Sequence, residues 1–257
     1  MNNKRITKSL LPVNLFYNGV ANVYDKMIDF EKNLELRKQA YKKIFPIKGT
    51  IADVGCGIGL DSIALAFNGH NVFSFDVSHQ MITAAKQNAL KYGVRIKTKV
   101  SSFVDLPKEY HKRFNNVISV GNTIAHLNKK ELGDAIKKVY SLLIPGGEVF
   151  LHILNYGKIL KQRNRINNIA SRDGKIIIRF YDFNKRDIDF NILYFESDDP
   201  KEFKLVSTKH YPQSKKEILS ILNNTGFHQI KFSGNFNGEK FNSRDSKDLF
   251  IKAVKKL

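Results

Sequence analysis

The feature of the sequence that limits its fold most strongly is a glycine-rich loop at residues 53–59, which reads DVGCGIG. An apolar run at residues 50–55 leads into this loop, and apolar residues recur at helical spacing over residues 61–67 after it. Glycines allow a tight turn there, and the N-terminus of the following helix offers free N–H groups. Asp76 ends the next apolar run, where a carboxylate suits the hydroxyls of a ribose. The sequence therefore predicts a nucleoside site between a strand and a helix.

Short apolar runs continue to alternate with amphipathic stretches as far as residue 153. Predicted strands cover residues 50–55, 71–76, 95–100, 115–121 and 147–153, and predicted helices cover residues 61–67, 81–92 and 129–143. Alternation at this spacing is typical of βαβ units in a parallel, doubly wound α/β sheet.

Residues 158–212 lack this alternation. Three strand-like runs, at residues 175–183, 188–197 and 203–211, follow one another without a helix and predict an antiparallel β meander. A helix at residues 213–224 and strands at residues 228–234 and 248–255 then resume the earlier pattern. We therefore expect one domain over residues 1–257. Its parts are a helical N-terminal arm at 1–49, a core at 50–157 and 213–257, and a substrate cap inserted at 158–212.

The spacing of the glycines favours one nucleoside cofactor over another. The dinucleotide fingerprint is G-x-G-x-x-G, whereas this loop has G-x-G-x-G. Asp53 precedes the loop, and its charge would repel a pyrophosphate at the helix N-terminus while tolerating an amino group. S-adenosylmethionine carries an ammonium and a sulfonium and no phosphate, so we expect this cofactor rather than NAD.

Two longer segments carry a family resemblance. Residues 51–85, IADVGCGIGLDSIALAFNGHNVFSFDVSHQMITAA, resemble the first two motifs of class I S-adenosylmethionine-dependent methyltransferases. Residues 142–151, LLIPGGEVFL, resemble the fifth-strand signature of that family. The resemblance covers about residues 15–257 and implies a seven-stranded Rossmann-like sheet with S-adenosylmethionine as cofactor.

A narrower resemblance is to the glycine N-methyltransferase-like group. It rests on SVGNTIAHL at 119–127, LNYGKIL at 154–160, KHYP at 209–212, and Arg37 four residues before Tyr41. The resemblance implies a set of cofactor-binding residues, which are Tyr24, Arg37, Asp53, Gly55, Gly57, Gly59, Asp76, Val77, Met81, Ser102, Phe103 and Val120. It also implies residues of the methyl-transfer pocket, which are Tyr17, His126 and the three candidate catalytic residues Asn122, Tyr156 and Tyr211.

The resemblance gives some of these residues individual roles. Arg37 would bind the cofactor carboxylate, Asp76 would hold the ribose, and Ser102 and Phe103 would flank the adenine. Asn122 would accept a hydrogen bond from the nucleophilic amine, which must lie about 3–3.5 Å from the methyl group. Structural alternatives stay open: Asn122 as a cap of the turn after its strand, His126 as a buried packing residue, and Arg37 paired with Glu35 or Asp29.

The sequence departs from the glycine-specific enzymes at the substrate site. The arginine that they place before Asn-Tyr is Leu154 here, and their tyrosine pair in the inserted segment appears as Ile178-Arg179. Ser102 stands where many methyltransferases have an acid. We therefore expect an amine substrate held elsewhere, and the candidates for binding an anionic group are Arg163, Arg165, Arg172 and Arg179.

The charge of the chain supports an alternative function. Lys and Arg number 43 against 24 Asp and Glu, which gives a net charge of +19, and residues 158–186 are especially basic. An excess of this size is typical of nucleic-acid binding, but no block of five or six like charges and no aromatic-interleaved basic patch accompanies it. We expect a small-molecule N-methyltransferase; the alternatives are a tRNA or rRNA methyltransferase and a non-catalytic protein that binds S-adenosylmethionine.

The sequence also excludes some sites and leaves the oligomeric state open. A single cysteine, Cys56, rules out an intramolecular disulfide and any multi-cysteine metal site. The seven histidines fall singly, so no metal is expected. No apolar run approaches the length of a membrane span, and we expect a cytoplasmic protein without a membrane partner.

Overall fold

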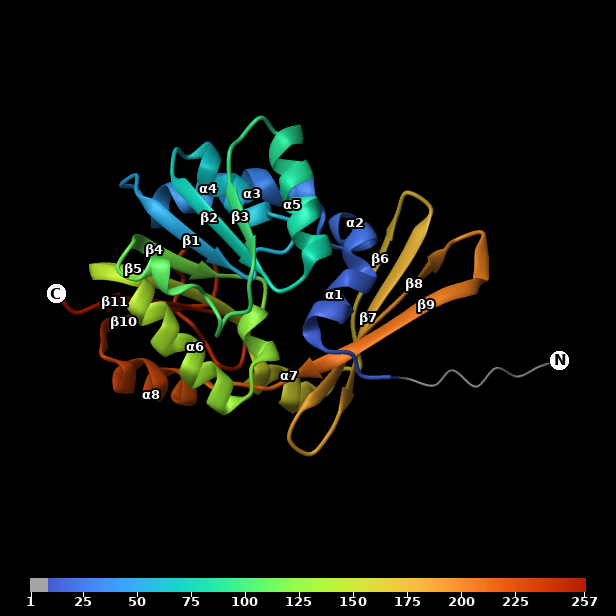
Figure 1. Ribbon diagram of the computed structural model, residues 1–257. Coiled ribbons are helices and arrows are strands. Elements are labelled where there is room, and N and C mark those ends of the chain that lie inside the picture. Colours follow the sequence, from blue (N-terminus) through green and yellow to red (C-terminus); the bar gives the residue numbers. More distant parts are fainter. Residues whose placement is uncertain (1–8) are drawn as a thin grey trace.

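Two β-sheets build the protein, which is described here by a computed structural model over residues 9–257 (Figure 1). The larger sheet has seven strands in the order β10-β11-β5-β4-β1-β2-β3. Its strands are β1 (Thr50–Val54), β2 (Asn71–Asp76), β3 (Lys97–Val100), β4 (Phe114–Ser119), β5 (Leu143–Leu154), β10 (Phe227–Ser233) and β11 (Asp248–Lys255). β1 to β5 pair in parallel, and β11 pairs antiparallel with both of its neighbours. The sequence prediction of a doubly wound seven-stranded sheet is confirmed.

Helices cover both faces of this sheet, as Figure 1 shows, with α3, α4 and α5 on one face and α6 and α8 on the other. The helices, including short 3₁₀ turns labelled η, are α1 (Val13–Val20), η1 (Ala21–Val23), α2 (Tyr24–Ile28), α3 (Phe30–Ile44), α4 (Leu60–Phe67), α5 (His79–Lys91), η2 (Lys108–Tyr110), η3 (Thr123–His126), α6 (Lys129–Leu142), α7 (Tyr156–Gln162) and α8 (Lys215–Thr225). α5 begins at Ser78, its N-cap, whose side chain accepts a hydrogen bond from Met81 N. None of the described helices is both long and apolar enough to cross a membrane.

The inserted segment forms a second, antiparallel sheet of four strands rather than the predicted three. Its order is β6 (Ile166–Arg172), β7 (Lys175–Phe183), β8 (Ile188–Glu196) and β9 (Asp199–His210). β6 was missed because it is an edge strand with mostly exposed residues, so it lacks a strong apolar alternation. β9 begins before the predicted residue 203 and contains Pro200, which an edge strand tolerates because the missing N–H leaves no ladder bond unmade.

The first part of the N-terminal arm lies between the two sheets, where α1 and α2 occupy the space between core and cap in Figure 1. Phe16 packs against Phe190 of β8 with ring centroids 5.7 Å apart, and the Tyr194 hydroxyl donates to Gly19 O at 2.8 Å. Thr208 of β9 donates to Leu11 O at 3.0 Å. The arm therefore binds one face of the cap sheet and presents its other side to the core.

Candidate active site

The glycine loop follows β1 with positive φ at three positions, Gly55 (+78°), Gly57 (+53°) and Gly59 (+87°). A Cβ atom at Gly55 would lie 2.3 Å from Thr123 Cγ2, so this glycine allows close packing of the loop on the turn after β4. At Gly57 the nearest atom is a ring carbon of Tyr24 at 4.0 Å, so the backbone is left open for a ligand. The loop thus needs Gly55 so that it can pack against Thr123, and Gly57 so that a ligand can approach its backbone.

A cavity of about 480 Å³ opens at the carboxyl ends of β1, β2 and β4, beneath the N-terminal arm. This volume falls within the range of roughly 300–1,000 Å³ that small-molecule sites occupy. The predicted cofactor residues that line it are Tyr24, Arg37, Gly55, Gly57, Asp76, Val77, Ser102, Phe103 and Val120. Tyr17 and His126 also line it, whereas Asp53, Gly59, Met81, Asn122, Tyr156 and Tyr211 do not.

Asp76 anchors one part of the cavity. Its two carboxylate oxygens accept hydrogen bonds from Gly57 N and Ser78 N, both at 2.9 Å, so the side chain is fixed beside the glycine loop. Burial raises the pKa of Asp76, and the backbone hydrogen bonds partly oppose this shift. The remaining lone pairs of the carboxylate could accept hydrogen bonds from the ribose hydroxyls of the cofactor.

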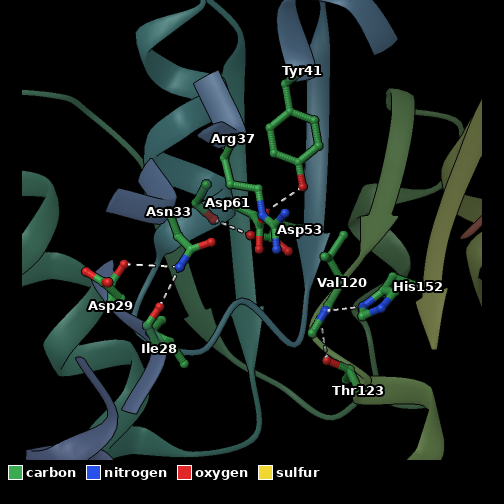
Figure 2. A network of polar contacts seen from close by, with 12 residues as sticks. Ile28, Asp29, Asn33, Arg37, Tyr41, Asp53, Asp61, Val120, Thr123 and His152 are labelled. Carbon is green, nitrogen blue, oxygen red and sulfur yellow. Dashed lines mark hydrogen bonds and ion pairs between the residues drawn. The ribbon is translucent and has the colours of Figure 1, made fainter. Parts of the chain in front are cut away.

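Arg37 and Asp61 form a pair of opposite charges at another part of the cavity (Figure 2). Arg37 Nε lies 2.9 Å from Asp61 Oδ1, and the Tyr41 hydroxyl donates to the same oxygen at 2.6 Å. The guanidinium also stacks 3.8 Å from the ring centroid of Phe236. The pair complements the zwitterionic amino-acid end of S-adenosylmethionine. Sequence reasoning missed Asp61, although a carboxylate in the first turn after the glycine loop was the available signal.

Asp53 lies beneath the loop rather than in the cavity wall. Its carboxylate accepts a 2.6 Å hydrogen bond from Ser62, whose hydroxyl in turn accepts one from Ser74 at 2.7 Å. Burial, reinforced by the charge of Asp61, raises the pKa of Asp53 to about 8. Met81 is likewise fully buried, in the first turn of α5. A direct cofactor contact by either residue therefore stays a prediction from the family resemblance.

Tyr17 and His126 form the polar part of the opposite wall. The Tyr17 hydroxyl lies 2.8 Å from His126 Nε2, and His126 Nδ1 lies 3.2 Å from the backbone oxygen of Lys209. A carbonyl oxygen can only accept, so Nδ1 carries the imidazole proton and Nε2 accepts the proton of Tyr17. The lone pairs of the Tyr17 oxygen are therefore left for a group in the cavity. His126 takes part in this wall as well as packing beside His210.

The three candidate catalytic residues lie outside the cavity lining. Asn122 Nδ2 donates to the Tyr156 hydroxyl at 3.0 Å, and its Oδ1 accepts Leu154 N at 3.0 Å. Tyr156 lies 2.9 Å from His210 Nδ1, which completes a buried chain. Asn122 also accepts a backbone hydrogen bond from Ala125 that opens η3, as expected of a turn cap. These contacts support a positioning role, and a direct contact between Asn122 and the amine stays a prediction.

The buried His126 makes the stability of the protein depend on pH. Burial lowers the pKa of His126 from 6.5 to about 4. Between these values the unfolded chain binds the proton and the folded chain does not, so stability is fully present above pH 6.5 and falls as the pH drops toward 4. We expect His126 to account for a loss of about 3 kcal/mol across this window, measured by urea unfolding at pH 7 and at pH 4.5.

The contribution of His126 is isolated by His126→Gln, which cannot titrate. This variant should lose less stability on acidification than the wild type does, whereas His79→Gln, at an exposed position on α5, should match the wild type. Equal acid sensitivity of the wild type and His126→Gln would contradict the assignment.

Comparisons with known proteins bear on this arrangement. A family described as a methyltransferase domain matches residues 51–147. A glycine/sarcosine N-methyltransferase from Halorhodospira halochloris is 28% identical over 148 residues, 56% of this chain and 55% of that protein. Another from Aphanothece halophytica is 23% identical over 95% of this chain and 90% of that protein. A ubiquinone biosynthesis O-methyltransferase from Xanthomonas axonopodis pv. citri is 32% identical over 44% of this chain.

The chain thus spans about half the length of the Halorhodospira and Xanthomonas proteins, 55% and 46% respectively. Among solved structures, an S-adenosylmethionine-dependent methyltransferase from Clostridium acetobutylicum superposes with a TM-score of 0.76 at 16% identity, over 94% of this chain and 99% of that one. The fold of this chain agrees with that structure over nearly its whole length. The segment that matches the family includes the glycine loop, Asp76 and the strands that position them. Residues 51–147 thus match a methyltransferase domain, and the chain has the fold of an S-adenosylmethionine-dependent methyltransferase.

Proposed function

We propose that this chain transfers the methyl group of S-adenosylmethionine to the nitrogen of a small amine held between the core and the cap sheet. The observation that carries the proposal is the character of the polar groups in the cavity wall: they offer hydrogen bonds but no free base. A hydroxyl acceptor must lose its proton as it is methylated, whereas a neutral amine brings its own lone pair. The cavity therefore suits an amine better than an alcohol or a phenol.

The titratable groups of the described cavity lining support this distinction. The carboxylates there, Asp61, Asp76 and Glu131, each accept hydrogen bonds from protein groups. His126 has a pKa of about 4, so it is a poor proton acceptor at neutral pH. Burial also raises the pKa of Tyr17 well above its ordinary value, and Tyr17 therefore stays a neutral phenol.

The wall residues would orient the amine rather than activate it. With its proton donated to His126, Tyr17 accepts an N–H of the amine and directs the nitrogen lone pair toward the cofactor. The bound cofactor supplies a methyl group already activated by the sulfonium. Tyr24 and Phe103 line the same cavity, where aromatic faces attract sulfonium and methylammonium groups through cation–π contacts. Asn122 and Tyr156 support this wall from behind.

A methyl-transfer screen tests the proposal. The substrates are glycine, sarcosine, other small amines, amino sugars, a phenol and bulk tRNA, with the labelled methyl group counted in each product. We expect transfer to a small amine. The names of the N-methylating relatives support the first two substrates, and the O-methyltransferase relative makes the phenol a necessary arm.

Removal of the Tyr17 hydroxyl should then slow the same reaction. Tyr17→Phe is expected to lower kcat about tenfold, the cost of one aligned hydrogen bond of about 1.4 kcal/mol. Tyr140→Phe, on α6 and outside the cavity lining, is the matched control and should keep the wild-type rate. Transfer to tRNA or to the phenol alone would replace the proposal, and cofactor binding without transfer to any substrate would favour a non-catalytic protein.

A further inference from the structure

Four arginines at the start of the inserted segment were candidates for binding an anion, and the structure separates one of them from the rest. Arg165 forms an ion pair with Asp182 at 2.6 Å, and Arg172 forms one with Asp29 at 2.8 Å. Arg163 stacks over the ring of Phe183. Arg179 has no carboxylate partner within residues 9–257, and its Nε is buried without a hydrogen-bond partner. Of these four arginines, Arg179 is therefore the one whose guanidinium is available to bind an anion.

The register of the cap sheet places Arg179 on its inner face. Side chains alternate along β7, so Arg179 shares a face with the buried Ile177 and Tyr181. The cross-strand neighbours of these three residues on β8 are Tyr194, Ile192 and Phe190, in the order Ile177, Arg179, Tyr181. Tyr194 and Phe190 contact the N-terminal arm. Arg179 therefore lies between the cap sheet and the arm.

The surroundings of Arg179 connect it to the cavity. Its charge acts on the phenols of Tyr17, Tyr24 and Tyr181, lowering their pKa values against the effect of burial. Tyr17 and Tyr24 line the cavity from the arm, whereas Arg179 lies on β7 of the cap and is not itself among the lining residues. Burial raises the pKa of Tyr24 to about 12, which keeps that phenol neutral. Arg179 thus places one positive charge near the neutral phenols of the cavity wall.

This charge opposes the stability of the free protein. Desolvation lowers the pKa of Arg179, and no carboxylate among residues 9–257 pairs with the guanidinium to offset the lost water. The side chain is only half-buried, so part of it is still accessible to a ligand. A monoanion with two oxygens in a plane would match both its single charge and the fork of its N–H groups.

We propose that Arg179 binds a carboxylate of the substrate, so that the acceptor is an amine that also carries a carboxylate. This inference rests on the proposed function and names its substrate class. The guanidinium comes from β7 of the cap, and the apolar Leu154, at the end of β5, leaves the core side without a cation at that position. The substrate would bridge the two sheets, with its nitrogen toward Tyr17 and its carboxylate toward Arg179.

Acetate is the simplest probe of the carboxylate subsite. In the presence of S-adenosylmethionine, acetate should raise the Tm of the wild type above that in sodium chloride of equal ionic strength, and acetamide should have no effect. Arg179→Met should abolish the acetate shift. Without ligand this variant should melt at the same temperature or about 2–4 °C higher, because an unpaired charge has been removed.

Arg172→Met is the matched control on the neighbouring strand. It breaks the ion pair with Asp29 and should keep the acetate shift whatever its own Tm. An acetate shift that persists in Arg179→Met, or none in the wild type, overturns the inference. A response to inorganic phosphate but not to acetate also overturns it, because it assigns the site to another anion.

Kinetics separate this inference from the proposed function. With a carboxylated amine, Arg179→Met should raise the KM for that amine about 10- to 100-fold and leave the KM for the cofactor unchanged. Equal use of amines with and without a carboxylate would overturn the inference while methyl transfer stands. An Arg179-dependent acetate shift without transfer to any amine would support the subsite and overturn the proposed function.

Discussion

Gly55→Ala is expected to destabilise the protein by about 3 kcal/mol and to abolish its response to S-adenosylmethionine. Gly55 has φ of +78°, which costs an L-residue about 1–2 kcal/mol. The new methyl group would also lie 2.3 Å from Thr123 Cγ2, and such overpacking typically costs about 1–3 kcal/mol. Relief of the clash must displace either the glycine loop or the turn after β4, both of which line the cavity. Thermal unfolding with and without cofactor measures both effects.

Gly93→Ala separates the cost of the positive φ from the cost of the clash. Gly93 ends α5 with φ of +66°, and its Cβ would meet nothing within 4 Å, so this variant carries only the backbone cost. It should lose about 1 kcal/mol and keep the full cofactor response. The double variant Gly55→Ala/Thr123→Ala should recover part of the lost stability. Equal losses at Gly55 and Gly93 would contradict the packing role of Gly55.

The core of the fold could be predicted from the sequence because its signals are local. β1, β2 and β4 are short, largely apolar runs, and each ends at or directly before a polar or glycine residue, as Asp76 shows at the end of β2. Both faces of these three strands are largely buried, so the runs are distinct from the amphipathic helices between them. The seven-stranded order then follows from the family resemblance rather than from the periodicity.

The cap and the arm were harder to predict because their strands and helices depend on distant partners. β6 pairs on one side only and exposes Ile166 and Ile169, so no apolar face marks it as a strand. α1 is held by Phe190 and Tyr194, which lie far along the chain. Such tertiary contacts override local propensity and leave little trace in a single sequence.

The candidate site likewise contains some residues that the sequence identified correctly and others that it did not. The glycine loop and Asp76 are adjacent in sequence to the strands that position them, and both lie in the cavity as expected. Asn122 has a conspicuous motif around it, yet its amide is bonded to Tyr156 and to the backbone of Leu154, over 30 residues away. Asp61 had no such motif and nevertheless faces the cavity beside Arg37. Sequence spacing identified the loop, but only the tertiary contacts show which side chains are already engaged.

Asp76→Ala should weaken the binding of S-adenosylmethionine about 100-fold, because a buried carboxylate that accepts ribose hydroxyls contributes charge-assisted hydrogen bonds of about 1.5–3 kcal/mol each. At a cofactor concentration 100 times the wild-type Kd, ligand binding stabilises the wild type by about 2.7 kcal/mol, and most of this shift should vanish in the variant. Isothermal titration calorimetry gives Kd directly, and thermal unfolding without ligand gives the separate cost of losing the hydrogen bonds from Gly57 and Ser78.

Two further variants distinguish a loss of affinity from a general loss of stability. Asp76→Asn keeps one acceptor oxygen beside the loop, so its free protein should be more stable than Asp76→Ala while its cofactor affinity is still reduced. Asp134→Ala removes an exposed carboxylate that pairs with Lys137 on α6, and it should bind cofactor as the wild type does. Because burial raises the pKa of Asp76, wild-type affinity should also fall on acidification at a higher pH than an exposed aspartate would require. A Kd for Asp76→Ala within twofold of the wild-type value would remove Asp76 from the cofactor site, and the ribose would then need another acceptor in the cavity wall.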